Sequence, residues 1–145
     1  MPSFSRSATL EWLEDVKPHP ASVTAGSGAF QVAASGPRIA GEPEGVTTPE
    51  EMLAASHAIC YGIGLRSLIA QEGGTARRVA VTATITADKG PQGIVLRSSH
   101  LNAVVEGLEG IAPSRLPEIA RATERGCTIS NAIRAAVLIT VDIES

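Results

Sequence analysis

The sequence predicts an α+β fold, in which short strands are followed by a long central helix, a hairpin, two shorter helices and a final strand. Residues 8–47 are rich in Gly, Pro, Ser and Thr and contain short alternating pieces. From residue 52 to about 71 apolar side chains recur at helical spacing, and residues 78–87 and 94–106 alternate between apolar and polar. With 145 residues, 43% hydrophobic and 19% charged, the chain suits one globular domain spanning 1–145.

The N-terminal region reads as short strands separated by turns. Ala8–Trp12 and residues 29–32 alternate as strands do, and Pro18-His19-Pro20 and Gly26-Ser27-Gly28 are turn sequences. The expected domain therefore begins with strands before any helix.

The central helix has a clear start and stop. Thr48-Pro49-Glu50-Glu51 supplies an N-cap, a proline at the first helical position and two carboxylates in the first turn. Gly73-Gly74 ends the segment. Because small and apolar residues occupy most positions between them, we expect this helix to be buried on more than one side.

The C-terminal half completes the fold. In the strand 78–87, Val79, Val81, Ala83 and Ile85 share one face. The remaining elements are expected as a turn at 88–93, a strand at 94–106, a helix from Pro113 to Gly126, a short helix from Thr128 to Arg134 and a last strand over Ala136–Ile143.

Charge and hydropathy exclude several classes of partner. The net charge is −3 and the basic residues are scattered, so we expect no nucleic acid and no anionic membrane as a partner. The N-terminus lacks the apolar core of a secretory signal, and no run approaches the roughly 18 apolar residues of a membrane helix. A soluble cytoplasmic protein is the expectation.

The chain has two cysteines in different settings. Cys60 lies inside the apolar central helix, and Cys127 opens the short helix that follows Arg125-Gly126. Two cysteines are too few for a metal cluster or a disulfide scaffold, and thiols are kept reduced in the cytosol. The two cysteines therefore either carry out redox chemistry together or occur together by coincidence. We expect neither a metal nor an organic cofactor.

Two further charged residues are candidates for the same site. Glu50 precedes Cys60 by ten positions, which places them about 80° apart around the helix and about 15 Å apart along it. They need a third group between them, and Arg38 can bind a carboxylate while its charge favours a thiolate. Cys127, at a helix N-terminus, is expected to have a lowered pKa.

Each of these residues also has a purely structural interpretation. Cys60 can be a small core residue, Glu50 a partner of the helix dipole, and Arg38 a solvated arginine. His57 permits a Cys–His pair with Cys60, but a histidine in this setting is more often hydrogen-bonded within the core. The residues alone leave a redox pair and a coincidence open.

Two motifs in order resemble a known family. Residues 48–60 are similar to the TNPEELLAAAHAxC segment of the osmotically inducible protein C (OsmC) and organic hydroperoxide resistance (Ohr) family, and residues 125–130 resemble its GCPVS signature. Trp12, the turns at 26–28 and 88–89 and the ending 139–142 also fit, so that the resemblance covers nearly the whole chain. The histidine and Trp12 place it nearer the OsmC branch.

The resemblance implies antiparallel sheets around a long buried central helix, an intertwined homodimer, and a thiol peroxidase that reduces organic hydroperoxides to alcohols. It implies that Cys60 attacks the peroxide and becomes a sulfenic acid, that Cys127 then forms a Cys60–Cys127 disulfide, and that a dithiol, usually a lipoyl protein, reduces it. It also implies that Glu50 holds Arg38.

Two alternatives remain. One is an OsmC-like redox-sensing or small-ligand-binding protein with a regulatory disulfide and no peroxidase activity. The other is a structural domain with two inert buried thiols, which would resist alkylation.

Overall fold

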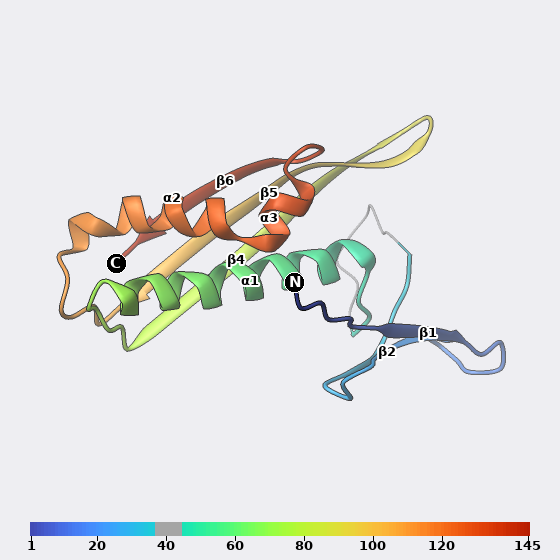
Figure 1. Ribbon diagram of the computed structural model, residues 1–145. Coiled ribbons are helices and arrows are strands. Elements are labelled where there is room, and N and C mark those ends of the chain that lie inside the picture. Colours follow the sequence, from blue (N-terminus) through green and yellow to red (C-terminus); the bar gives the residue numbers. More distant parts are fainter. Residues whose placement is uncertain (37–44) are drawn as a thin grey trace. The chain divides into compact units, whose positions relative to one another are not determined.

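The computed structural model describes residues 1–36 and 45–145 of the chain. Its contacts divide the protein into two compact units, Met1–Met52 and Leu53–Ser145. Each unit contains a three-stranded sheet, and one long helix begins in the first unit and continues in the second (Figure 1). The expected α+β class with a long central helix is thereby confirmed, and the expectation of one domain over 1–145 stays a prediction.

The N-terminal unit holds an antiparallel sheet of β1 (Ala8–Trp12), β2 (Ala21–Ala25) and β3 (Gln31–Ala33), in that order. The two predicted turns connect these strands, and Gly28 has a φ of 78°, a conformation that glycine adopts without strain. An apolar cavity of about 410 Å³ lies within this unit; it is lined by Leu10, Trp12, Ala21, Val23, Ala34, Ser35, Gly36, Thr47, Thr48, Pro49 and Met52.

Helix α1 (Pro49–Gln71) starts as the sequence predicts. The backbone N–H of Glu51 donates to Oγ1 of Thr48 at 3.2 Å, so Thr48 is the N-cap. The hydroxyl of Thr47 donates to the Glu51 carboxylate at 2.9 Å. At the other end the N–H of Gly74 donates to the carbonyl of Ile69 at 2.9 Å, which satisfies one of the last helical carbonyls.

Helix α1 presents one face to the core and another to solvent. Its buried residues recur every four positions: His57, Tyr61, Leu65 and Ile69. Ile59 and Ile63 are 61% and 64% exposed. Burial on more than one side, as the sequence predicted, is therefore not achieved within this one chain.

By length and composition α1 is also apolar enough to cross a membrane. The expectation concerned an unbroken run of about 18 apolar residues, which α1 does not contain, whereas the mean hydropathy of the helix is high despite its polar residues. A single helix of this kind is weak evidence for a membrane span, since core helices share the property.

The C-terminal unit begins with a long hairpin of β4 (Arg78–Gly90) and β5 (Gly93–Glu106). The strands pair through Gly90 and Gly93, so the turn is shorter than the predicted 88–93. A register shift between Thr86 and Ala87 accompanies the extra length. Alternation is confirmed, with Val79 opposite Val105 on the core face.

The last strand, β6 (Leu138–Glu144), pairs with β5 in parallel, so this sheet is mixed and not antiparallel as expected. Parallel neighbours need a crossover connection, and here it consists of the 3₁₀ turn η1 (Pro113–Arg115), α2 (Leu116–Gly126) and α3 (Thr128–Ile133). Apolar alternation reports which face of a strand is buried and says nothing of the strand's direction.

The core of this unit lies between the helices and one face of the sheet, as Figure 1 shows for α1 and α2 beside β4, β5 and β6. Its buried members include Tyr61 and Leu65 from α1, Leu101 from β5, and Ile119 from α2. The hydroxyl of Tyr61 donates to the carbonyl of Ala120 at 3.1 Å. This packing fixes α1 against α2.

Candidate functional site

Cys127 occupies the sharp turn between α2 and α3. Its backbone is extended (φ −74°, ψ 118°), so it ends α2 and serves as the N-cap of α3. The N–H of Ser130 donates to Cys127 Sγ at 3.5 Å, in the place where a serine or threonine oxygen commonly accepts. The sulfur is thus held by the backbone of the helix that follows it, and Cys127 is buried.

Cys60 of α1 meets the same turn. Burial by itself raises the pKa of the half-buried Cys60 thiol. That effect is outweighed by hydrogen bonds from the backbone N–H of Ile129, the Cys127 thiol and the backbone N–H of Thr128, so the pKa of Cys60 is lowered. The structure therefore brings the two predicted cysteines together and favours the thiolate on Cys60.

Cys127 behaves in the opposite way. Burial raises its pKa, and the hydrogen bond and negative charge of Cys60 raise it further, against the lowering effect of Ser130. The sequence predicted a lowered pKa from the helix N-terminus. That prediction is wrong because Cys60 takes the N–H groups at the start of α3, and because a second thiolate beside the first is disfavoured.

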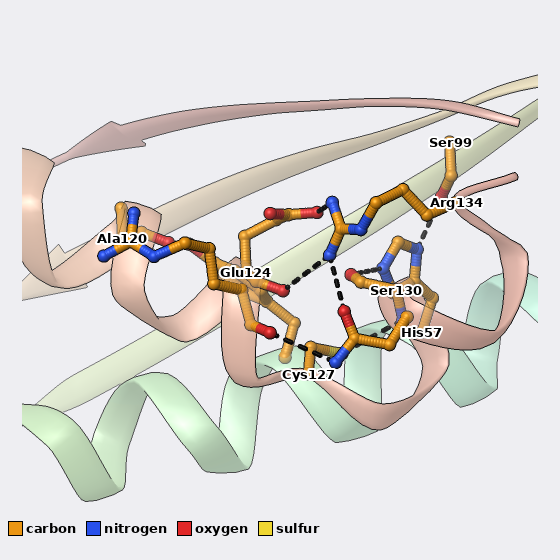
Figure 2. Close-up of polar contacts among 10 residues, drawn as sticks. His57, Ser99, Ala120, Glu124, Cys127, Ser130 and Arg134 are labelled. Atoms are coloured by element: carbon orange, nitrogen blue, oxygen red, sulfur yellow. Dashed lines mark hydrogen bonds and ion pairs between the residues drawn. The ribbon is translucent and has the colours of Figure 1, made fainter.

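His57 is fully buried and has a partner at each ring nitrogen. Nδ1 lies 2.6 Å from Oγ of Ser99 on β5, and Nε2 lies 2.7 Å from Oγ of Ser130 on α3 (Figure 2). The expectation of a histidine satisfied within the core is confirmed. Since both nitrogens are bonded to serines, the alternative of a directly hydrogen-bonded Cys–His pair is not formed.

Burial lowers the pKa of His57, the nearby Glu124 carboxylate raises it, and Arg134 lowers it. The net direction is downward, so the imidazole is neutral near pH 7. A neutral imidazole carries one N–H donor and one acceptor nitrogen.

A polar network holds α2 to α3 around this site. Arg134 forms an ion pair with Glu124 and donates to Oδ1 of Asn131 at 2.8 Å. Asn131 in turn donates to the carbonyl of Arg125 at 3.1 Å. These contacts span the turn that carries Cys127 and so fix where its sulfur lies.

The other two predicted site residues are Glu50, which the structure describes, and Arg38, which it does not. Glu50 is half-buried in the first turn of α1, at the end of the helix that belongs to the N-terminal unit. Arg38 lies outside the described residues. Within residues 1–36 and 45–145, no group of three or more His, Cys, Asp or Glu side chains is arranged to hold a metal ion.

Sequence reasoning did not single out Ser99 or Ser130. Ser130 is the serine of the segment that resembles GCPVS, so this motif carried a signal for it. Ser99 had none, because it is one of two adjacent serines in a strand and only the fold shows which of them faces His57.

Comparison with known proteins gives consistent results. Residues 41–142 match the family described as OsmC-like protein. The chain is 27% identical over 143 residues to the peroxiredoxin OsmC of Escherichia coli, covering 99% of both chains. Its fold is similar to that of an organic hydroperoxide resistance protein OsmC from Legionella pneumophila (TM-score 0.77, 21% identity, 100% of both chains). It is also similar to that of OhrB of Bacillus subtilis (TM-score 0.71, 19% identity, 97% of this chain and 98% of that one).

Proposed function

Because this chain belongs to the OsmC-like family, we propose that it is a thiol-dependent peroxidase that reduces organic hydroperoxides to alcohols. The observation that carries the proposal is the contact between two unequal thiols, Cys60 with a lowered pKa and Cys127 with a raised one. Cys60 is thereby favoured as the attacking thiolate, and Cys127 stays a thiol. The names of the relatives, peroxiredoxin and organic hydroperoxide resistance protein, support the same chemistry.

In the first step the Cys60 thiolate attacks one oxygen of the hydroperoxide. A sulfur–oxygen bond forms, the oxygen–oxygen bond breaks, and the alkoxide takes up a proton and leaves as the alcohol. The sulfur is oxidised by two electrons to a sulfenic acid, and the peroxide is reduced by two.

In the second step Cys127 attacks the sulfenic sulfur of Cys60. A disulfide forms and the hydroxyl leaves as water with the proton that Cys127 gives up. An external dithiol, which we propose is carried by a lipoyl protein, then returns both cysteines to the reduced state by exchange.

We assign Arg38 and Glu50 to the first step. Lowering a thiol pKa from about 8.5 to about 6 makes it mostly thiolate at pH 7, but nucleophilicity falls with a Brønsted slope of about 0.4–0.5 and removes most of the gain. A cation that stabilises the departing oxygen is therefore needed. Arg38, held by Glu50, is proposed to supply it.

We further propose that the two units form one OsmC-like domain and that two chains form a homodimer. The exposed Ile59 and Ile63 of α1 support association, because isoleucines more than 60% exposed on a helix lose contact with water when a partner covers them. A cytoplasmic location, with neither nucleic acid nor membrane as a partner, is consistent with the net charge of −3.

The test is stoichiometric. One equivalent of cumene hydroperoxide is added to the reduced protein, free thiols are counted, and the product is mapped by mass spectrometry. We expect both thiols to disappear with a Cys60–Cys127 disulfide, more slowly with hydrogen peroxide. Cys60→Ser should consume no peroxide, and Cys127→Ser should stop at the sulfenic acid. Slow, non-saturating consumption of peroxide with clean disulfide formation would instead identify a redox sensor. Survival of both thiols would exclude the peroxidase and the redox sensor alike.

A further inference from the structure

A continuous chain of buried polar groups runs away from the two sulfurs. The backbone N–H of Ser130 donates to Cys127 Sγ at 3.5 Å, and Oγ of the same serine lies 2.7 Å from Nε2 of His57. Nδ1 of His57 lies 2.6 Å from Oγ of Ser99. His57, Ser99 and Ser130 are each 0% exposed and Cys127 is 4% exposed. Bulk water therefore does not reach the Cys127 thiol freely.

The hydroxyl of Ser130 has a single proton, so it cannot donate to Cys127 and to His57 at the same time. If the Cys127 thiol donates to Ser130 Oγ, the Ser130 hydroxyl is left to donate to Nε2, and Nδ1–H donates to Ser99. If Cys127 is a thiolate, the Ser130 hydroxyl donates to the sulfur, the protonated Nε2 donates to Ser130, and Nδ1–H still donates to Ser99. A shift of protons along the chain interconverts the two states without moving a heavy atom.

We propose that Ser130 and His57 form a proton relay that removes the thiol proton of Cys127 as it attacks oxidised Cys60. The inference rests on the proposed two-cysteine function and assigns a role to two residues outside the predicted site. His57 acts through Ser130, so it is a positioning residue with a proton-accepting ring.

The relay explains how Cys127, a thiol at rest, can attack oxidised Cys60. Burial raises the pKa of Cys127 and keeps it a thiol, yet only the thiolate is an effective nucleophile. Taking the proton while the sulfur–sulfur bond forms avoids building up a buried negative charge on Cys127. His57 is neutral and thus free to accept.

The reaction balances in atoms and electrons. Cys127 loses its proton to Ser130, and Ser130 passes its own to His57. The sulfur–sulfur bond forms and the sulfur–oxygen bond of the sulfenic acid breaks. The departing hydroxide becomes water with the proton that Cys127 gave up, which the imidazolium returns through the Ser130 hydroxyl, so the relay is unchanged after each cycle.

The charges around His57 are compatible with a short-lived imidazolium. Glu124 of α2 raises the pKa of the ring and Arg134, at the end of α3, lowers it. The sheet contributes the hydroxyl of Ser99, and the facing titratable groups of the site are the thiols of Cys60 and Cys127. Because the Arg134 guanidinium pairs with Glu124, the two charges largely offset each other at the ring.

The relay can be tested without peroxide. The probe is 5,5′-dithiobis(2-nitrobenzoate), which reacts with Cys60 and releases one thionitrobenzoate. Cys127 then displaces the second thionitrobenzoate in an intramolecular step that needs the same deprotonation. We expect His57→Gln and Ser130→Ala to leave the first release within threefold of wild type and to slow the second about 100-fold at pH 7, the lower end of general-base effects.

The pH profile separates a relay from a purely structural role. Between about pH 7 and 8.5 the second release should be nearly flat in the wild type, because His57 is neutral and Cys127 protonated throughout. In both variants it should rise about tenfold per pH unit, since the free thiolate must then form from solvent. Ser130→Thr, which keeps the hydroxyl, should restore a flat profile, and Ser98→Ala, at the adjacent serine outside this chain of contacts, should stay within threefold of wild type.

Wild-type second-release rates in both His57→Gln and Ser130→Ala, or slowed rates with a flat profile, overturn the relay. If one variant does not fold, the other decides. The peroxidase proposal is judged separately by the reaction of wild-type protein with cumene hydroperoxide. A protein that fails to form sulfenic acid but shows the predicted second-release profile would refute the peroxidase and retain the relay.

Discussion

The Arg134 guanidinium pairs with the Glu124 carboxylate across the turn that carries Cys127. This ion pair ties the end of α3 to the last turn of α2, and its Glu124 side chain is only 15% exposed. The position of the second thiol therefore depends on a contact that includes neither sulfur.

Arg134→Ala should loosen this turn and slow disulfide formation, while the first thiol reacts as before. Small displacements of reacting atoms are costly, and we expect the second step to slow roughly tenfold. The unfolding free energy should fall by about 1 kcal/mol or less, since the Arg134 side chain is 44% exposed. Rapid-quench mass spectrometry measures the rate. Arg97→Ala, which breaks an exposed pair with Asp88 in the hairpin, is the control, and an equal effect there would contradict the prediction.

The stability of the protein should decrease as the pH falls below about 6.5. In the unfolded chain His57 takes up a proton near its ordinary pKa of about 6.5. In the folded chain its pKa is lowered by burial, so acidification favours unfolding until the folded pKa is passed. Melting temperatures at pH 7, 6 and 5 should show a smaller decline in His57→Gln than in wild type. His19→Gln should keep the wild-type slope.

The two thiols should be alkylated at different pH. Cys60, with a lowered pKa, should react with iodoacetamide well below the pH at which an ordinary cysteine does. Cys127, buried and with a raised pKa, should resist at pH 7. Peptide mass spectrometry over pH 5.5–9 measures each rate. In urea both should approach the same pH dependence, and equal rates in the native protein would argue against the proposed division of roles.

Arg38→Lys should lose most peroxidase activity while the fold stays intact. A lysine keeps the charge but not the planar fork that binds a carboxylate and a developing oxyanion together. Steady-state turnover with cumene hydroperoxide measures the loss, and circular dichroism checks the fold. Arg77→Lys, at an exposed arginine paired with Glu106, is the matched substitution. Near-wild-type turnover by Arg38→Lys would remove Arg38 from the site.

Replacing Ile59 and Ile63 together by Glu should convert a dimer to monomers. Two carboxylates on the exposed face of α1 would oppose two more across an association surface, which desolvates charge at high cost. Light scattering after size exclusion measures the mass. Val95→Glu, at a 46% exposed position in β5, should leave the mass unchanged. A wild-type protein that is already monomeric would refute the dimer.

Much of the fold could be predicted because local signals agree with the final structure. Thr48 caps α1 where a threonine precedes proline and two glutamates, and the glycines after Gln71 end the helix. Alternation identified both hairpin strands and their core face. The parallel direction of β6 was not predicted, because it depends on the path of the connection from β5 to β6 and not on the residues of β6.

The sequence singled out the two sulfurs that the structure brings together, but not the groups around them. Cys60 and Cys127 could be chosen as the only two cysteines. Their relative pKa could not be foreseen, because it depends on which sulfur receives the N–H groups of Thr128 and Ile129. The contact from Ser130 to His57 joins positions 73 apart, and serine occurs too often in this chain for such a pairing to be recognised.

The parallel pairing of β6 with β5 affects the order in which the protein can be assembled. Cys127 lies in the connection between these strands, and the pairing of β6 fixes the far end of that connection to the sheet. The ribosome makes β6 after the connection. During synthesis Cys60 therefore emerges before Cys127, and under the proposed mechanism a Cys60 oxidised in that interval would have no second thiol with which to form a disulfide.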